Sequence, residues 1–185
     1  MKKQPVNSGK IANLNGQRLE DALAMKLDTL GFRLFSSEKE YLEYTSIDFS
    51  TVDMTPENCY LLQPTFIGMF GKSKKNKDCS ITIFDKNKNK QTICVELRYQ
   101  NTTGSVLEKY PKTWLELYSC VNADKCFVVY EGKELTGKRG QEIFAWFNRA
   151  YLWFEENGMS FKNKDKEIKA LYIDDFVTHI KSLIV

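Results

Sequence analysis

An unusual mixture of side chains occupies residues 93–109, ICVELRYQNTTGSVLEK. Ile93, Val95 and Leu97 alternate with polar residues, which is the period of a β-strand whose apolar face enters a core. The opposite row carries a carboxylate, a guanidinium and an amide, from Glu96, Arg98 and Gln100. That row faces either water or a functional site. In a site, the carboxylate would suit a metal ion and the guanidinium a phosphate.

A second acidic residue comes into range if the preceding strand pairs with this one. Residues 79–84, CSITIF, are also rich in β-branched residues, and the polar DKNKNK that follows is typical of a hairpin loop. Pairing Phe84 with Lys90 would set Asp78 opposite Glu96, with Cβ atoms roughly 4.5–5.5 Å apart. Such carboxylates repel unless a cation lies between them, and magnesium binds through one or two carboxylates. This register predicts a magnesium site, and a slip of one residue would separate the two faces.

Three further residues have either a site role or an ordinary surface role. Glu20 belongs to a helix predicted over residues 15–30, beside its inward stripe of leucines. It is either a third acid of the site or a boundary residue that reaches solvent or pairs with a lysine. Glu108 and Lys109 follow the turn NTTGS at the start of another helix. Backbone N–H groups there favour an anion, and the alternative is two exposed helix residues.

Histidine and cysteine chemistry is excluded by composition. His179 is the only histidine, and the five cysteines form no CxxC pair. A Cys/His zinc site or a Ser-His or Cys-His hydrolase is therefore not expected, and catalysis must rest on carboxylates, lysines or arginines. The odd number of cysteines predicts free, mostly buried thiols. The sequence has no secretory signal and no apolar span, so we expect a cytoplasmic protein without a membrane partner.

Lysines gather between residues 71 and 90, although the net charge of the chain is only +3. A local basic cluster is typical of a surface that binds a phosphate backbone, and the alternative is a solvated hairpin kept soluble by its charges. The hairpin loop contributes Lys86, Lys88 and Lys90. The candidate backbone contacts nearest the acidic residues are Lys72, Lys74, Lys75, Lys77 and Lys109.

The elements that must position these residues follow from the apolar pattern. We expect one domain over residues 1–185, of which 1–14 are loosely structured. The expected elements are a helix over 15–30, short strand-like pieces between 32 and 70, the two hairpin strands, a helix ending near 120 with Pro111 in its first turn or at a kink, a strand over 125–132, an aromatic helix over 137–158, a strand over 168–173 and a final helix. This order predicts an α/β domain with a mixed sheet and helices on both faces.

Assembled in this way, the residues resemble the PD-(D/E)XK nuclease superfamily. The match consists of a helix-borne Glu20, Asp78 at the start of a hairpin strand, and Glu96-Leu97-Arg98 on the next strand, extended by Gln100, Gly104-Ser105 and Glu108-Lys109. The resemblance implies a restriction-endonuclease-like αβα sandwich with a central mixed sheet. It also implies Mg²⁺, with Mn²⁺ as a substitute, bound by Asp78, Glu96 and Glu20. Gln100 and Glu108 would position a water or a metal ligand.

The short chain is also similar to the small catalytic subunits of heterodimeric Type IIS restriction endonucleases. That similarity implies site-specific hydrolysis of one strand of double-stranded DNA, beside a larger subunit that recognises DNA and nicks the other strand, in a bacterial cytoplasm. Most of the aromatic helix is expected to be buried in the chain's own core, and part of it would then meet the partner. Two alternatives are a homodimeric repair or junction-resolving nuclease of the same fold, and a non-catalytic DNA-binding module with a decayed site.

One position departs from the family pattern. Arg98 stands where the family has a lysine. A lysine can orient or activate the attacking water, whereas arginine stays protonated and cannot act as a base. Arginine still holds a phosphate and stabilises developing negative charge. Either the chemistry tolerates this change, with Lys109 as a candidate replacement, or the site is impaired.

Overall fold

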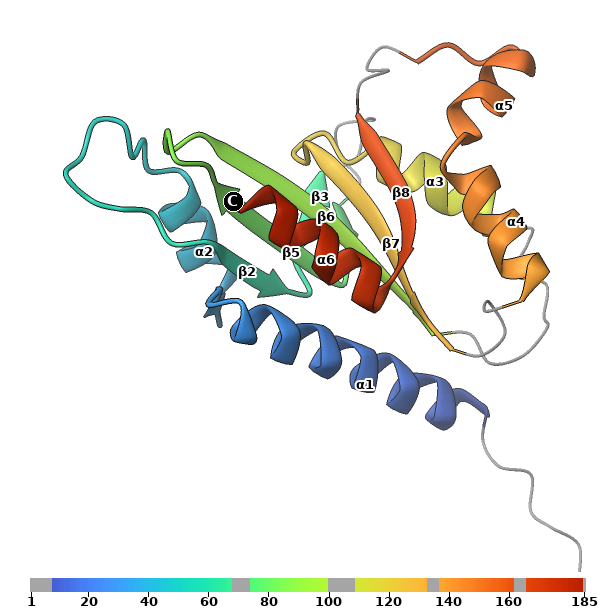
Figure 1. Ribbon diagram of the computed structural model, residues 1–185, viewed down its shortest axis with the longest axis horizontal. Coiled ribbons are helices and arrows are strands. Elements are labelled where there is room, and N and C mark those ends of the chain that lie inside the picture. Colours follow the sequence, from blue (N-terminus) through green and yellow to red (C-terminus); the bar gives the residue numbers. More distant parts are fainter. Residues whose placement is uncertain (1–7, 68–73, 100–108, 133–136, 162–165, 185) are drawn as a thin grey trace, which may run out of the picture.

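The computed structural model of the chain describes residues 8–67, 74–99, 109–132, 137–161 and 166–184. Within these ranges the main sheet contains six strands: β1 (Arg33–Phe35), β2 (Cys59–Leu62), β5 (Cys79–Phe84), β6 (Lys90–Tyr99), β7 (Lys125–Glu131) and β8 (Glu167–Tyr172). Their spatial order is β1-β2-β5-β6-β7-β8 (Figure 1). The β2–β5 and β5–β6 pairs are antiparallel and the others parallel, so the sheet is mixed, as predicted. A separate antiparallel pair consists of β3 (Thr65–Ile67) and β4 (Lys74–Asn76).

The central hairpin has the predicted register. Phe84 pairs with Lys90, and the ladder continues to Cys79 opposite Val95. The turn is organised by Asp85, whose Oδ1 accepts hydrogen bonds from the backbone N–H groups of residues 87 and 89, both at 2.8 Å. A turn closed by its own side chain fixes the loop length, and the loop length fixes which residues pair along the strands.

Helices cover both faces of the sheet (Figure 1). The leucine stripe of α1 (Ser8–Thr29) packs with α6 (Ile173–Leu183) against the face formed by Ile81, Ile93 and Val95. On the opposite face, α3 (Tyr110–Tyr118), α4 (Lys138–Phe147) and α5 (Ala150–Glu156) pack around Trp114 and Phe147. The result is an αβα sandwich with a central mixed sheet, which confirms the predicted fold class.

Two helices differ from their expected bounds. Helix α1 begins at Ser8, inside the stretch expected to be loosely structured, because residues 8–14 contain no proline and include good helix formers. The aromatic helix expected over 137–158 is divided into α4 and α5. The division lies at Asn148, whose Oδ1 accepts a hydrogen bond from the backbone N–H of Ala170 in β8 at 3.0 Å. That tertiary contact is invisible in the local apolar pattern.

A further helix, α2 (Glu38–Thr45), was not expected between the first strand-like pieces. Its N-cap Ser37 accepts a hydrogen bond from the backbone N–H of Glu40 at 3.5 Å, which is the S-x-x-E signature of a helix start. The helix packs Tyr41 against Phe35 and Leu61 at the β1–β2 end of the sheet. The capping signature in the sequence could therefore have identified this helix.

Two further sequence predictions concern the cysteines and the absence of a membrane span. All five cysteines are buried and free, as predicted. Among the described residues, no helix combines the length and the apolar character needed to cross a bilayer.

Candidate active site

Asp78 stands immediately before β5 and faces Glu96 of β6. The ladder pairs Cys79 with Val95, so the next pair outward sets Asp78 opposite Glu96. Asp78 Oδ2 accepts a hydrogen bond from the backbone N–H of Leu97 at 2.6 Å. Because the N–H groups of a strand lie in the plane of its sheet, this bond turns the Asp78 carboxylate toward the β6 backbone. The two predicted acids therefore meet where the hairpin ladder ends.

Glu96 is a buried carboxylate with a cation on each oxygen. The residue is 8% exposed and projects toward the face covered by α3. Its Oε1 lies 2.5 Å from Nη2 of Arg98, and its Oε2 lies 3.2 Å from Nζ of Lys77. A buried carboxylate requires this kind of pairing, because an unpaired charge in the interior is strongly unfavourable.

Lys77 was predicted as one of the DNA-backbone lysines, and the structure places it inside the site. Its side chain is only 3% exposed, and Nζ also lies 3.8 Å from Oε2 of Glu116 on α3. Burial alone would lower the pKa of Lys77, but the charge and hydrogen bond of Glu96 together with the nearby thiols of Cys94 and Cys120 outweigh burial, and the pKa is raised. The ammonium group is therefore a charged part of the acidic cluster rather than a surface contact.

Glu116 is a site residue that the sequence analysis missed. It lies one residue before the buried Leu117 and three after the buried Thr113, at the edge of the inward face of α3. An acid at such a helix position is a signal of an internal ion pair. A second lysine also lies near Glu116: Nζ of Lys112, on the exposed side of the helix, is 3.9 Å from Oε1 of Glu116.

Glu20 approaches the same site from α1. Its Oε1 accepts a hydrogen bond from the side-chain amide of Gln63 at 2.6 Å. The backbone N–H of Gln63 donates to the carbonyl oxygen of Asp78 at 3.0 Å, so one residue touches both acids. Gln63 has a φ of 52°, in the left-handed region that non-glycine residues seldom occupy. No feature of the sequence pointed to Gln63, because this role depends on a turn between β2 and β3.

The charges of these acids disfavour one another. Burial raises the pKa of Asp78, and the charge of Glu96 raises it further. Burial likewise raises the pKa of Glu20, followed by the charge of Asp78. Carboxylates in this state gain from a nearby cation.

The oxygen donors of Asp78, Glu96 and Glu20 are the ligands that Mg²⁺ prefers. Within the described residues, no three potential ligands already stand close enough to hold a metal together. Magnesium needs only one or two carboxylates, with waters and phosphate as its other ligands. The oxygen donors of Asp78 and Glu96, with Glu20 beside Asp78, are therefore of the chemical kind that a hard divalent cation binds.

For several other predicted site residues, the structure does not test the predicted role. Gln100, Glu108 and Lys72 lie outside the described residues, and for Lys74 and Lys75 only the backbone, in β4, is described. Lys109 is exposed at the start of α3. The structure therefore brings Glu20, Asp78, Glu96 and Arg98 together and adds Lys77, Glu116 and Gln63 to them.

The hairpin-loop lysines lie away from this cluster. Strand β5 is six residues long, so the turn is roughly 20 Å from the acidic end of the hairpin. Lys88 Nζ donates to the carbonyl oxygen of Val52 at 3.2 Å, and Lys90 Nζ donates to that of Thr45 at 2.9 Å. Lys90 thus binds the C-terminal end of α2 and Lys88 the loop that follows it, which the basic pattern alone did not show.

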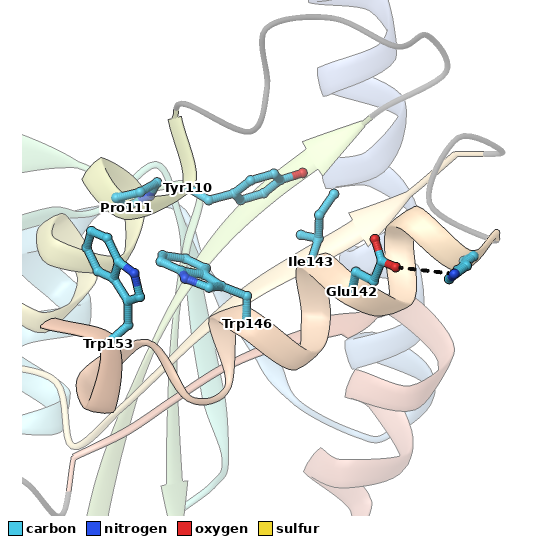
Figure 2. A pocket seen from close by; sticks show the side chains of 7 residues that line it. Tyr110, Pro111, Glu142, Ile143, Trp146 and Trp153 are labelled. Atoms are coloured by element: carbon cyan, nitrogen blue, oxygen red, sulfur yellow. Dashed lines mark ion pairs between the residues drawn. The ribbon is translucent and has the colours of Figure 1, made fainter. Parts of the chain in front are cut away.

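A pocket of about 650 Å³ lies between the start of α3 and helices α4 and α5 (Figure 2). It is lined by Tyr110, Pro111, Lys138, Glu142, Ile143, Trp146 and Trp153. The rings of Trp146 and Trp153 pack edge to face beneath Pro111, with their centroids 6.2 Å apart. Phe147 and Phe154 are buried, as expected for most of the aromatic helix, whereas Trp153 is 44% exposed. The exposed part of this aromatic surface borders the pocket.

The family model described as the PD-(D/E)XK nuclease superfamily domain matches residues 11–183. Neither the comparison with curated proteins nor that with solved structures gave a significant match. The match spans α1, the central hairpin and α6, and therefore every element that carries a candidate site residue.

Proposed function

The chain belongs to the PD-(D/E)XK nuclease superfamily, and from that premise we propose that it is a Mg²⁺-dependent endonuclease subunit. It hydrolyses one strand of duplex DNA and acts with a larger subunit that recognises DNA and nicks the other strand. The observation that carries the proposal is the hairpin register that sets Asp78 opposite Glu96 beside Glu20 and Arg98. This is the arrangement of acids and a cation that phosphodiester hydrolysis requires.

Each residue has a role that follows from its surroundings. Asp78 and Glu96 would hold the divalent metal, with Mn²⁺ as a substitute for Mg²⁺, and Glu20 would contribute through water or hold a second ion. The metal, when bound, polarises the phosphate and lowers the pKa of a bound water. Arg98, 47% exposed, reaches an incoming phosphate and stabilises the charge of the transition state. Gln100 and Glu108 lie outside the described residues, and only the family resemblance assigns them the role of positioning water or a ligand.

The aromatic surface of α5 supports the partner in this proposal. Tyr151, Leu152 and Trp153 are consecutive large side chains that are each at least 40% exposed. Trp153 also lines the pocket, exposed apolar groups of this kind are typical of a protein–protein contact, and tryptophan and tyrosine are enriched at such contacts. The occupant we propose is an apolar side chain of the larger subunit.

A cleavage assay tests the function. Intact and nicked duplexes are incubated with the chain, with and without the candidate large subunit, at varied Mg²⁺. E96Q and D78N should each lower cleavage of the assigned strand at least about 100-fold, since each removes a metal ligand. E43Q, which changes an exposed acid in the Lys39–Glu43 pair of α2, is the matched control and should cut at the wild-type rate.

Cleavage of both strands at the wild-type rate by E96Q would show that the site assignment is wrong. Weak cleavage by the chain alone is compatible with the proposal, because a partner is part of it. A stable homodimer of the isolated chain, measured by its native mass, would instead favour a homodimeric repair or junction-resolving nuclease.

One observation favours a second function, that of a non-catalytic DNA-binding module. Both oxygens of Glu96 are already paired with cations of the chain itself. A decayed site would retain such ion pairs and bind no metal. Calorimetric titration with Mg²⁺ or Mn²⁺ separates the two functions: binding that is lost in D78N supports the nuclease, and no binding to the wild type supports the module.

A further inference from the structure

Lys77 is a buried ammonium group that joins two elements of the candidate site. Its Nζ lies 3.2 Å from Glu96 on β6 and 3.8 Å from Glu116 on α3. Its other titratable neighbours include the thiols of Cys94 and Cys120. A lysine that is 3% exposed has given up nearly all its hydration, and the two carboxylates replace that hydration. Lys77 is thus part of the internal structure of the site.

The two cations on Glu96 differ in how easily each can leave. Arg98 is 47% exposed, so its guanidinium can rotate into solvent and regain water. Lys77 is anchored through its backbone N–H to the carbonyl oxygen of Pro64 at 3.0 Å, and withdrawing its ammonium would leave buried carboxylates without their partner. Separating a buried pair is far more costly than separating an exposed one. A ligand that approaches Glu96 therefore displaces Arg98.

We propose that Lys77 is a permanent counter-ion that positions Glu96 and restrains the affinity of the site for a divalent cation, while Arg98 is the exchangeable partner of Glu96. The inference rests on the proposed function, because the exchange occurs when DNA enters. Arg98 then leaves Oε1 and donates to a phosphate oxygen, for which the guanidinium fork is well suited. Lys77 stays on Oε2, so a lysine serves Glu96 although arginine occupies the motif position.

A fixed positive charge beside Glu96 has a measurable consequence. It repels any divalent cation that binds the same carboxylate. Two unit charges about 4 Å apart change a binding constant roughly fivefold at the dielectric constant of water, so fivefold is a lower bound for a divalent cation in a partly buried site. Removing the charge of Lys77 should therefore strengthen metal binding, whereas a merely structural role predicts weaker binding as the site loosens.

Calorimetric titration of the full chain with Mn²⁺, without DNA, tests this sign. K77M should bind Mn²⁺ about fivefold or more tightly, whereas its cleavage rate should fall roughly 10- to 100-fold because Glu96 is no longer held in place. K77R keeps the charge and should bind within about twofold of the wild type. K166M is the matched control. Lys166 is part-buried but its ammonium group bonds to backbone carbonyl groups, so the Mn²⁺ affinity of K166M should equal that of the wild type.

Unchanged or weaker Mn²⁺ binding by folded K77M would overturn the inference. If K77M does not fold, the double variant K77M/E116Q replaces it, because removing one charge of each sign leaves no excess buried charge. Relative to E116Q alone, the double variant should again bind Mn²⁺ about fivefold more tightly. Equal affinity of the double variant and E116Q would likewise overturn the inference.

A second measurement tests the exchange of Arg98. Binding of a short duplex is followed by fluorescence anisotropy in metal-free, low-salt buffer. R98A should lose about tenfold in affinity, the value of one charge-assisted hydrogen bond, and K77M should stay within about twofold of the wild type. Equal losses in K77M and R98A, or no loss in R98A, would contradict the exchange.

These outcomes are distinguishable from failure of the proposed function. If the wild type cleaves DNA with metal but K77M binds Mn²⁺ no more tightly, the role of Lys77 is wrong and the nuclease stands. If neither the wild type nor K77M binds Mn²⁺, both proposals fail. If the wild type binds Mn²⁺ and never cleaves, with or without a partner, the nuclease fails while the calorimetry still decides the role of Lys77.

Discussion

The two halves of the acidic site are built differently. Glu96 meets a cation on each of its oxygens, Lys77 and Arg98. Asp78 and Glu20, among the described residues, accept hydrogen bonds from uncharged donors, a backbone N–H and the amide of Gln63. Burial raises the pKa of both Asp78 and Glu20, and each also has a neighbouring negative charge that raises it further.

The difference shows where a bound metal would matter most. The Glu96 half is stabilised by the chain's own cations, so its carboxylate supports folding without any ligand. In the Asp78–Glu20 half, the fold disfavours the ionised form of both carboxyl groups, and a bound divalent cation would stabilise that ionised form. Removing a carboxylate should therefore have opposite effects on the stability of the metal-free protein in the two halves.

The largest expected effect is on the Glu96 half. E96Q should lower the free energy of unfolding of the metal-free protein by about 2–3 kcal/mol, because it leaves Lys77 buried with Glu116 as its remaining partner. Urea denaturation measures the change. E57Q, which breaks the exposed Arg33–Glu57 pair, should change stability by less than about 0.5 kcal/mol. If E96Q is as stable as the wild type, the ion pairs of Glu96 do not stabilise the fold, and the two halves do not differ in this way.

The opposite sign is expected on the other half. D78N should raise the Tm of the metal-free protein by about 2 °C, because asparagine still accepts the Leu97 hydrogen bond and carries no charge. The rise in Tm produced by Mg²⁺ in the wild type should disappear in D78N. Differential scanning calorimetry with and without Mg²⁺ measures both effects. A lower Tm of D78N without metal would mean that the charge of Asp78 is already compensated.

The pH dependence of stability sharpens the same contrast. An acid whose pKa is raised by folding contributes stability below its unfolded pKa, and that contribution is lost as the pH rises through the raised folded pKa. Asp78 and Glu20 should therefore destabilise the metal-free protein progressively above about pH 4. Over this pH range, the free energy of unfolding of the E20Q/D78N variant should rise relative to that of the wild type. Parallel stability curves of the two proteins would contradict the pKa shifts.

The smallest expected effect concerns Gln63, which links Asp78 to Glu20. Q63A should lower the free energy of unfolding by about 1 kcal/mol through loss of the amide hydrogen bond. Q63G loses the same bond but adopts the φ of 52° without strain, so it should lie within about 0.5 kcal/mol of the wild type. Equal stabilities of Q63A and Q63G would show that the backbone at this position carries no strain.

The hairpin was predictable because its determinants are local. Alternation over the two strands and the polar loop between them indicated a hairpin, and the assumed pairing of Phe84 with Lys90 is the one that the structure has. The helices on both faces followed from apolar periodicity in the same way. The capping signature at Ser37 was equally local and could have identified α2.

The remaining features depend on contacts between distant segments. Asn148 divides the aromatic helix because it bonds to β8, and Gln63 touches both acids because a turn carries it there. Lys77 looked like its lysine neighbours in sequence, and only the packing of α3 over the sheet buries it between Glu96 and Glu116.

The sequence by itself indicated the two hairpin strands and the acids that one assumed register would bring together, because strand alternation and a short polar loop are local features. The tertiary structure alone decided which charges neutralise which acid, because burial and ion pairing are set by segments that meet only when the sheet is covered.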